Sequence, residues 1–164
     1  MIRLVENKDI EQICNIYNFY VKNSTATFEE EEVSLNEMKN RVEELSKDLP
    51  YFVYEENNEI LGYSYGSKWK KRSAYKYTVE TSVYLKNDCI SKGLGTKLYS
   101  YLLEELKKRG IHSIIGGISL PNEKSQKLHE KLGFKKVAHF NQMGYKFDNW
   151  IDVGYWQLII EKNL

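Results

Sequence analysis

The stretch TVETSVYLKNDCISKGLGTK, residues 78–97, combines residue types that can do chemistry. Glu80 is a lone carboxylate in a strand pattern of apolar and β-branched residues, where burial would raise its pKa. Gly93 and Gly95 then lead directly into a long helical pattern. Glycine allows close backbone approach, and the unpaired amides at a helix start attract anions. The stretch therefore predicts an anion site beside a candidate acid–base carboxylate.

The glycine segment SKGLGTK fits one kind of phosphate site better than two others. A P-loop needs four residues between its glycines and a following Lys-Ser/Thr, and this spacing is absent. A dinucleotide-binding turn needs a third glycine where this chain has Leu98, and no βαβ unit begins the chain. A two-glycine turn late in a mixed domain fits an acyl-coenzyme A pyrophosphate. Such a pair also occurs at turns that bind nothing, so the motif alone leaves both interpretations open.

Length and charge narrow the class of protein. A chain of 164 residues predicts a single domain, 1–164, with a proper core. Its 24 basic and 23 acidic residues give no general attraction to nucleic acid or membrane. No apolar run approaches the roughly 20 residues of a membrane span, and the first residues lack a signal-peptide pattern. Two distant cysteines and three scattered histidines lack metal-ligand spacing, so we expect no metal and a cytoplasmic location.

Hydrophobic periodicity predicts a mixed α/β fold that positions this stretch. The expected helices cover residues 10–21, 35–49, 94–109 and the segment between Pro121 and Gly133. The expected strands cover residues 2–5, 51–56, 60–69, 74–85 and 112–120, with two more in 135–161. Asn7 or Asp9 can cap the first helix, and Ser34 with Glu37 forms a capping box for the second. Short connections favour antiparallel pairing, with one crossover helix after the glycine turn.

Five segments, in order over nearly the whole chain, resemble the Gcn5-related N-acetyltransferase (GNAT) superfamily, and within it the phosphinothricin and methionine sulfoximine N-acetyltransferase family. They are STATFEEE (24–31), GYSYGSKWKKRSAYKYTVETSVYL (62–85), KGLGTKL (92–98), LPNEKSQKLHEKLGF (120–134) and GYKFDNWIDVGYWQL (144–158). The resemblance implies a mostly antiparallel central sheet with splayed middle strands, flanked by helices. The superfamily usually has Gln or Arg where this chain has Ile90, so we expect one polar contact fewer to the pyrophosphate.

The resemblance implies acetyl-CoA as cosubstrate, held by the backbone of the splayed strand and of the glycine turn. The implied coenzyme contacts are Val83, Tyr84, Leu85, Ser91, Lys92, Gly93, Leu94, Gly95, Thr96, Asn122 and Lys131. Asn122 is equally suited to cap the helix that follows it. A solvated position is the alternative for Lys92.

The resemblance also assigns catalytic roles. Glu80 would be the general base for the acceptor amine, and its alternative is a solvent-facing strand glutamate. His129 stands where many relatives carry tyrosine, and it would either protonate the leaving thiolate or only pack against the sheet. Further candidates for this acid are Tyr99, Tyr101 and Tyr145.

The implied acceptor is a small amine that carries a carboxylate. Arg72 would bind that carboxylate through its guanidinium, although a basic turn with no specific role explains WKKR as well. The implied acceptor-binding residues are Phe28, Glu29, Lys71, Arg72, Tyr75 and Thr81. The family implies a homodimer, to which Phe147, Trp150 and Asp152 either contribute or are needed only for folding.

Three functions remain in competition. The first is acetyl transfer from acetyl-CoA to the α-amine of a phosphinothricin-like or methionine sulfoximine-like amino acid. The second is transfer to a polyamine, an aminoglycoside or a protein N-terminus, which only the acidic run 29–32 favours. The third is an acyl-CoA-binding sensor without turnover, against which the retained Glu80 argues.

Overall fold

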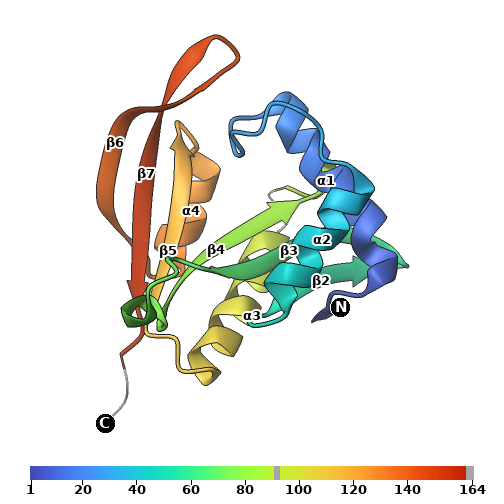
Figure 1. The fold of residues 1–164 in the computed structure, drawn as a ribbon, viewed down its shortest axis with the longest axis horizontal. Coiled ribbons are helices and arrows are strands. Elements are labelled where there is room, and N and C mark those ends of the chain that lie inside the picture. Colours follow the sequence, from blue (N-terminus) through green and yellow to red (C-terminus); the bar gives the residue numbers. More distant parts are fainter. Residues whose placement is uncertain (91–92, 162–164) are drawn as a thin grey trace.

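A computed structural model describes residues 1–90 and 93–161. Within them, seven strands form one sheet in the order β1-β2-β3-β4-β5-β7-β6, with helices on both faces (Figure 1). The strands are β1 (Ile2–Leu4), β2 (Tyr51–Glu56), β3 (Glu59–Lys68), β4 (Thr78–Leu85), β5 (Ser113–Leu120), β6 (Lys135–Lys146) and β7 (Asn149–Ile159). The helices are α1 (Ile10–Asn23), α2 (Leu35–Ser46), α3 (Leu94–Lys108) and α4 (Glu123–Lys131), with short 3₁₀ turns η1 (Asn7–Asp9), η2 (Ser73–Tyr75) and η3 (Asn87–Cys89). The predicted mixed α/β class is confirmed, and no helix in the described ranges has the length and apolarity to span a membrane.

The pairing of β4 with β5 is the exception in an otherwise antiparallel sheet. These two strands run parallel and are connected by the crossover helix α3. They pair only where Thr78–Glu80 faces Ser113–Ile115, whereas β4 stays paired with β3 as far as Leu85. Beyond Glu80 the two strands diverge, which is the splay that the resemblance implied (Figure 1).

The two faces of the sheet carry separate apolar cores. The core under α1 and α2 includes Ile13, Val53 and Tyr63. The core under α3 includes Val79, Leu98, Leu102 and Trp156. Because successive side chains of a strand point to opposite faces, Val79 and Thr81 face α3 and Glu80 faces the other side.

Some local predictions were wrong. The expected strand 74–85 begins only at Thr78, because β3 ends at Lys68, which pairs with Val79, and offers no partner to earlier residues. Ser73–Tyr75 form the 3₁₀ turn η2 instead. The second helix ends at Ser46 rather than near Leu49.

The predicted helix caps are only partly present. The Ser34 hydroxyl accepts a hydrogen bond from the Glu37 amide as predicted, whereas the Glu37 carboxylate binds Arg41 at 2.8 Å. Asp9 precedes α1, but its carboxylate binds Arg3 and does not cap the helix.

Candidate active site

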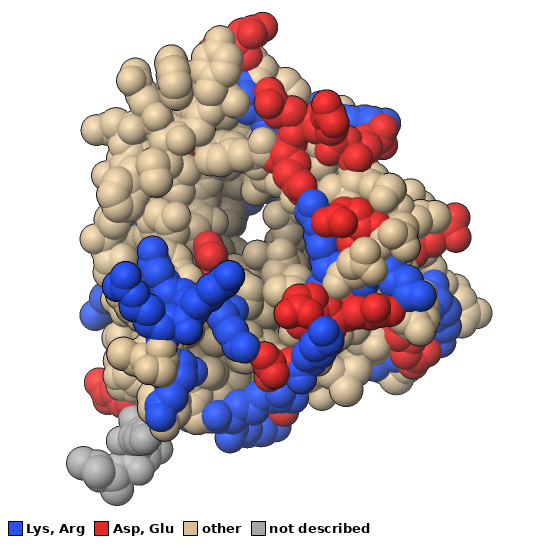
Figure 2. All heavy atoms as spheres, in the orientation of Figure 1, with Lys and Arg blue, Asp and Glu red and all other residues tan. Residues whose placement is uncertain are grey.

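A cavity of about 490 Å³ crosses the sheet where β4 and β5 diverge. Its wall comes from β4, the start of α3, the end of β5 and α4, together with Tyr20 and Ala26. Figure 2 shows an opening through the molecule at this place. The sequence-predicted residues in its wall are Thr81, Val83, Tyr84, Leu85, Gly93, Gly95, Thr96, Asn122, His129 and Lys131. The splay therefore brings most of the predicted coenzyme contacts around one space.

The remaining predicted residues lie elsewhere. Ser91 and Lys92 lie outside the described residues, and Leu94 begins α3 without lining the cavity. Glu80 is outside its wall as well, and so are Phe28, Glu29, Lys71, Arg72 and Tyr75.

The start of α3 has the geometry of an anion site. Gly93 precedes the helix with φ 79°, a left-handed conformation that favours glycine, although a side chain there would meet no atom within 4 Å. At Gly95 a Cβ would lie 3.3 Å from Leu85 Cδ1, so the first turn of α3 packs tightly on β4. Gly93, Gly95 and Thr96 line the cavity, and the first amides of a helix have no partner within it, so this end of α3 suits a phosphate group.

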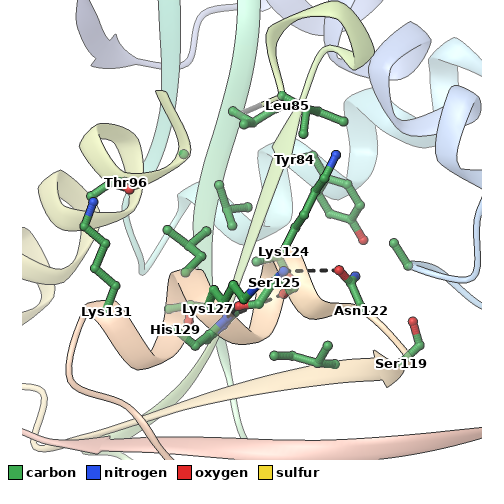
Figure 3. A pocket seen from close by; sticks show the side chains of 18 of the residues that line it. Tyr84, Leu85, Thr96, Ser119, Asn122, Lys124, Ser125, Lys127, His129 and Lys131 are labelled. Carbon is green, nitrogen blue, oxygen red and sulfur yellow. Dashed lines mark hydrogen bonds between the residues drawn. The ribbon is translucent and has the colours of Figure 1, made fainter. Parts of the chain in front are cut away.

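Helix α4 adds positive charge to this side of the cavity. Lys124, Lys127 and Lys131 line it, and Figure 3 shows Lys131 directed toward Thr96. The Asn122 side chain lines the cavity and also caps α4 by accepting a hydrogen bond from the Ser125 amide (3.1 Å). Lys124 and Lys127 were not among the residues predicted from the sequence, although their spacing with Lys131 places all three on one helix face.

Glu80 lies on the other face of the sheet, next to a residue of the cavity wall but not in the wall itself. Its Oε1 is so near Gly117, a wall residue, that a Cβ added there would lie 3.2 Å from it. Burial raises the pKa of Glu80 above its usual value, and no cation or hydrogen-bond donor in the described chain offsets this effect. A half-buried carboxylate with a raised pKa is suited to take up a proton near neutral pH.

A chain of buried hydrogen bonds lies on the α3–α4 face. His129 Nδ1 lies 2.8 Å from the Ser125 carbonyl, which can only accept, so Nδ1 carries a proton. Burial lowers the pKa of His129, so the ring is neutral and Nε2 accepts from the Tyr99 hydroxyl (3.1 Å). The Tyr99 oxygen then accepts from the Thr81 hydroxyl at 2.7 Å. Thr81 was expected to bind the acceptor, but its hydroxyl bonds Tyr99 on the opposite face of the sheet. Tyr99 is the direct hydrogen-bond partner of His129.

Two glycines in β5 make room for both ionisable side chains. A Cβ at Gly116 would lie 2.4 Å from His129 Nε2, and one at Gly117 would lie 3.2 Å from both Glu80 Oε1 and a Tyr155 ring carbon. Neighbouring strand residues face opposite sides of the sheet, so Gly116 leaves room for His129 on one face and Gly117 leaves room for Glu80 on the other. The Gly-Gly pair, unusual inside a strand, marks the place where two functional groups approach the same backbone.

The connection between β3 and β4 reaches the Glu80 face of the sheet. The Trp69 ring packs edge-on against Tyr155 at 5.8 Å between centroids, and Tyr155 contacts the Gly117 position. Lys71 and Arg72 follow Trp69 and are exposed. Figure 2 shows Lys and Arg side chains gathered where this connection lies, near the opening. Lys71 and Arg72, which lie outside the cavity wall, thus form a positive rim on the Glu80 face of the sheet.

The acidic loop after α1 is largely engaged within the chain. The Glu29 carboxylate binds the Arg41 guanidinium through two hydrogen bonds of 2.7 and 2.8 Å, and Glu32 pairs with Lys22 at 2.8 Å. Phe28 is in contact with the β6–β7 hairpin, because a Cβ at Gly144 would lie 2.5 Å from its ring.

Comparisons with known proteins agree with this geometry. The acetyltransferase (GNAT) domain family matches residues 2–154. The chain is 36% identical over 156 residues to the phosphinothricin N-acetyltransferase of Streptomyces viridochromogenes, covering 95% of this chain and 85% of that protein. It is 34% identical over 165 residues to the L-methionine sulfoximine/L-methionine sulfone acetyltransferase of Salmonella typhimurium, covering 99% and 95% of the two chains. A putative acetyltransferase of Salmonella typhimurium, solved with its cofactor acetyl-CoA, superposes with a TM-score of 0.96 at 33% identity and covers 100% and 95% of the two chains.

The contact between Gly116 and His129 predicts the effect of an alanine on stability. Gly116→Ala should lower the free energy of unfolding by about 1–3 kcal/mol, because the methyl group meets a ring held by Tyr99 and Ser125. Gly66→Ala is the matched control in β3, since its Cβ would meet nothing nearer than 3.5 Å. Urea unfolding of both variants measures the difference, and equal stability would contradict the contact.

Proposed function

The chain belongs to the acetyltransferase (GNAT) domain family, and from this premise we propose that its acceptor is the α-amine of a small amino-acid-like substrate of the phosphinothricin or methionine sulfoximine type. It is an acetyl-CoA-dependent N-acetyltransferase. The observation that carries the proposal is the position of Glu80, a half-buried carboxylate beside the wall residue Gly117, on the face that also bears the positive rim.

The α3–α4 side of the cavity suits the coenzyme. The residues that would hold it are the first-turn amides of α3, Thr96, Asn122 and the lysines of α4. Beyond Glu80 the edge of β4 that faces β5 is unpaired, so its backbone is free to bind an extended amide-containing arm. Acetyl-CoA supplies an activated acyl group with a thiol leaving group.

Glu80 is proposed as the general base. The amine arrives protonated, and only the neutral amine can attack a carbonyl carbon. Glu80 Oε1 lies beside the wall residue Gly117, and in this proposal it takes that proton directly or through one water. Burial raises the pKa of Glu80, so its carboxylate is a stronger base than that of an ordinary glutamate.

His129 is proposed to act on the thiol side. The neutral ring donates through Nδ1 to Ser125, and its Nε2 faces Tyr99, so it holds no proton to spare in this state. Protonation of Nε2 would make it an acid, and burial opposes that step. We therefore expect the acid role of His129 to contribute less to the rate than the base role of Glu80.

Arg72 is proposed to bind the acceptor carboxylate, with Lys71 and Tyr75 beside it and Phe28 as an aromatic wall. A guanidinium can bind a carboxylate through two parallel hydrogen bonds. The positive rim supports an acceptor with a negative group. A polycationic acceptor is less well supported, because Glu29 and Glu32 are already paired with Arg41 and Lys22.

We also propose that the protein is a cytoplasmic homodimer. Five large side chains of the β6–β7 hairpin are exposed, which suits an interface between two copies. They are Phe140, Met143, Tyr145, Phe147 and Trp150. Two cysteines, both buried, suit a reducing compartment.

Glu80→Gln should lower kcat by about 10²–10⁴-fold with a methionine sulfoximine acceptor, the usual worth of a general base. The dissociation constant of acetyl-CoA should stay unchanged, because the proposed coenzyme contacts on α3 and α4 lie on the other face of the sheet. Glu56→Gln, at the exposed end of β2, is the matched control. Steady-state kinetics and calorimetric binding test this, and wild-type kcat in Glu80→Gln would refute the base assignment.

The pH dependence follows from the same carboxylate. Since the base must be ionised, kcat/KM should fall on the acidic side as the pH drops through the raised pKa of Glu80, and Glu80→Gln should lack this limb. The raised pKa also means that Glu80 favours folding below its unfolded pKa, and that this contribution is lost as the pH rises through the folded pKa. At pH 7 the variant should therefore unfold at the same or a higher temperature. A lower melting temperature would indicate a structural role instead.

Arg72→Met should raise the acceptor KM about 10- to 100-fold, because a hydrogen bond to a charged group is worth about 1.5–3 kcal/mol. Lys76→Met removes one charge from the same connection, where its ammonium lies over the Tyr77 ring, and should change KM little. An amine that has the same side chain but no carboxylate should have the same KM in the wild-type enzyme and in Arg72→Met. A raised KM for that amine as well would argue against carboxylate recognition.

A further inference from the structure

Lys146 is a buried lysine at the end of a strand that is otherwise largely exposed. It is 1% exposed, whereas most other residues of β6 are open to solvent. Its ammonium donates to the backbone carbonyls of Ser24 (2.7 Å) and Thr27 (2.9 Å) and lies 4.9 Å from the centre of the Phe147 ring. Burying an ammonium is costly unless it is well paired, so this contact has a structural consequence.

The segment that Lys146 binds, residues 24–28, is held at two ends; we name it the strap. On the α1–α2 side, the Tyr17 hydroxyl bonds Thr27 Oγ1 at 2.8 Å, and Glu29, just beyond the strap, bonds Arg41. On the hairpin side, Lys146 binds two carbonyls and the Phe28 ring contacts Gly144. The strap thus joins the α1–α2 layer to the β6–β7 hairpin across more than a hundred residues of sequence.

The strap also borders the cavity. Ala26, in its middle, is a wall residue together with Tyr20 of α1. Figure 1 shows the loop after α1 reaching toward the β6–β7 hairpin above the divergence of β4 and β5, and Figure 2 shows the opening surrounded by protein. The side near Glu80 is consequently a closed ring rather than an open cleft.

We propose that Lys146 is a positioning residue that sets the size limit for acceptors, by holding the strap against the hairpin so that only small amines reach Glu80. This inference rests on the proposed function. If the coenzyme occupies the α3–α4 side, the acceptor must enter from the Glu80 side, past the strap. Loss of the two charged hydrogen bonds would let the strap move away and widen the ring.

The test compares two acceptors in wild type and Lys146→Met. The acceptors are methionine sulfoximine and a tripeptide that begins with methionine. In Lys146→Met the ratio of kcat/KM for the tripeptide to that for methionine sulfoximine should rise at least about tenfold, the worth of one hydrogen bond to a charged group. The dissociation constant of acetyl-CoA should not change. Lys135→Met, at the exposed start of the same strand, is the matched control and should keep the wild-type ratio.

A second variant tests the same proposal without changing Lys146, in case Lys146→Met does not fold. Gly144→Ala leaves Lys146 in place but drives a methyl group against the Phe28 ring, and it should raise the same ratio. An unchanged ratio in both variants would overturn the size limit.

Hydrogen exchange provides a readout that needs no turnover. The amides of Ala26 and Glu29 bond side chains within or next to the strap, whereas the Val33 amide bonds Asn18 of α1. In Lys146→Met the first two should exchange faster and the third should not. Unchanged exchange at Ala26 and Glu29 would overturn the strap itself, whereas wild-type protein inactive on both acceptors would overturn the proposed function instead.

Discussion

The short parallel pairing between β4 and β5 is the constraint on which the site depends. Three residues of each strand pair, and the strands then separate. Had the pairing continued, the backbone of β4 would be hydrogen-bonded to β5 and no cavity could cross the sheet. Divergence leaves polar backbone groups without a strand partner, and an extended ligand can satisfy them as an added strand would. The part of β4 beyond Glu80 therefore has an unpaired edge, which is available to the coenzyme.

The position of Glu80 follows from this constraint. It is the last residue of β4 that pairs with β5, so its backbone is still held on both sides while its side chain lies beside the wall residue Gly117. Opposite it, β5 carries no side chain at two successive positions, and the groups of both faces approach the bare backbone there. A carboxylate on one face and an imidazole–phenol pair on the other are thereby separated by a single strand. Proton transfer at the amine and events at the thiol can then occur on opposite sides of one plane.

The sequence predicted local features much better than long-range ones. The glycine turn, the helices and the antiparallel strands follow from periodicity and backbone preferences of neighbouring residues, as at Gly93 and Gly110, both with φ 79°. The buried state of Glu80 was predictable, because its strand neighbours are apolar. The pairing of His129 with Tyr99 was not, since thirty residues separate them and only the packing of α4 beside α3 brings them together. The start of β4 was misplaced because the end of its partner strand β3 sets the limit of β4. The periodicity of one strand does not show where its partner ends.

The contact between Lys146 and the strap is another long-range feature that the sequence pattern does not predict. Lysine at the end of an exposed strand predicts a solvated charge, and nothing in the local pattern indicates that a loop 119–122 residues earlier covers it. Yet this contact involves neither the coenzyme side nor Glu80. The strands β4 and β5 determine which reaction is possible, whereas the contact between the loop after α1 and the β6–β7 hairpin determines which amines arrive. A fold organised in this way can change its acceptor by altering a loop and a hairpin while the splayed strands stay as they are.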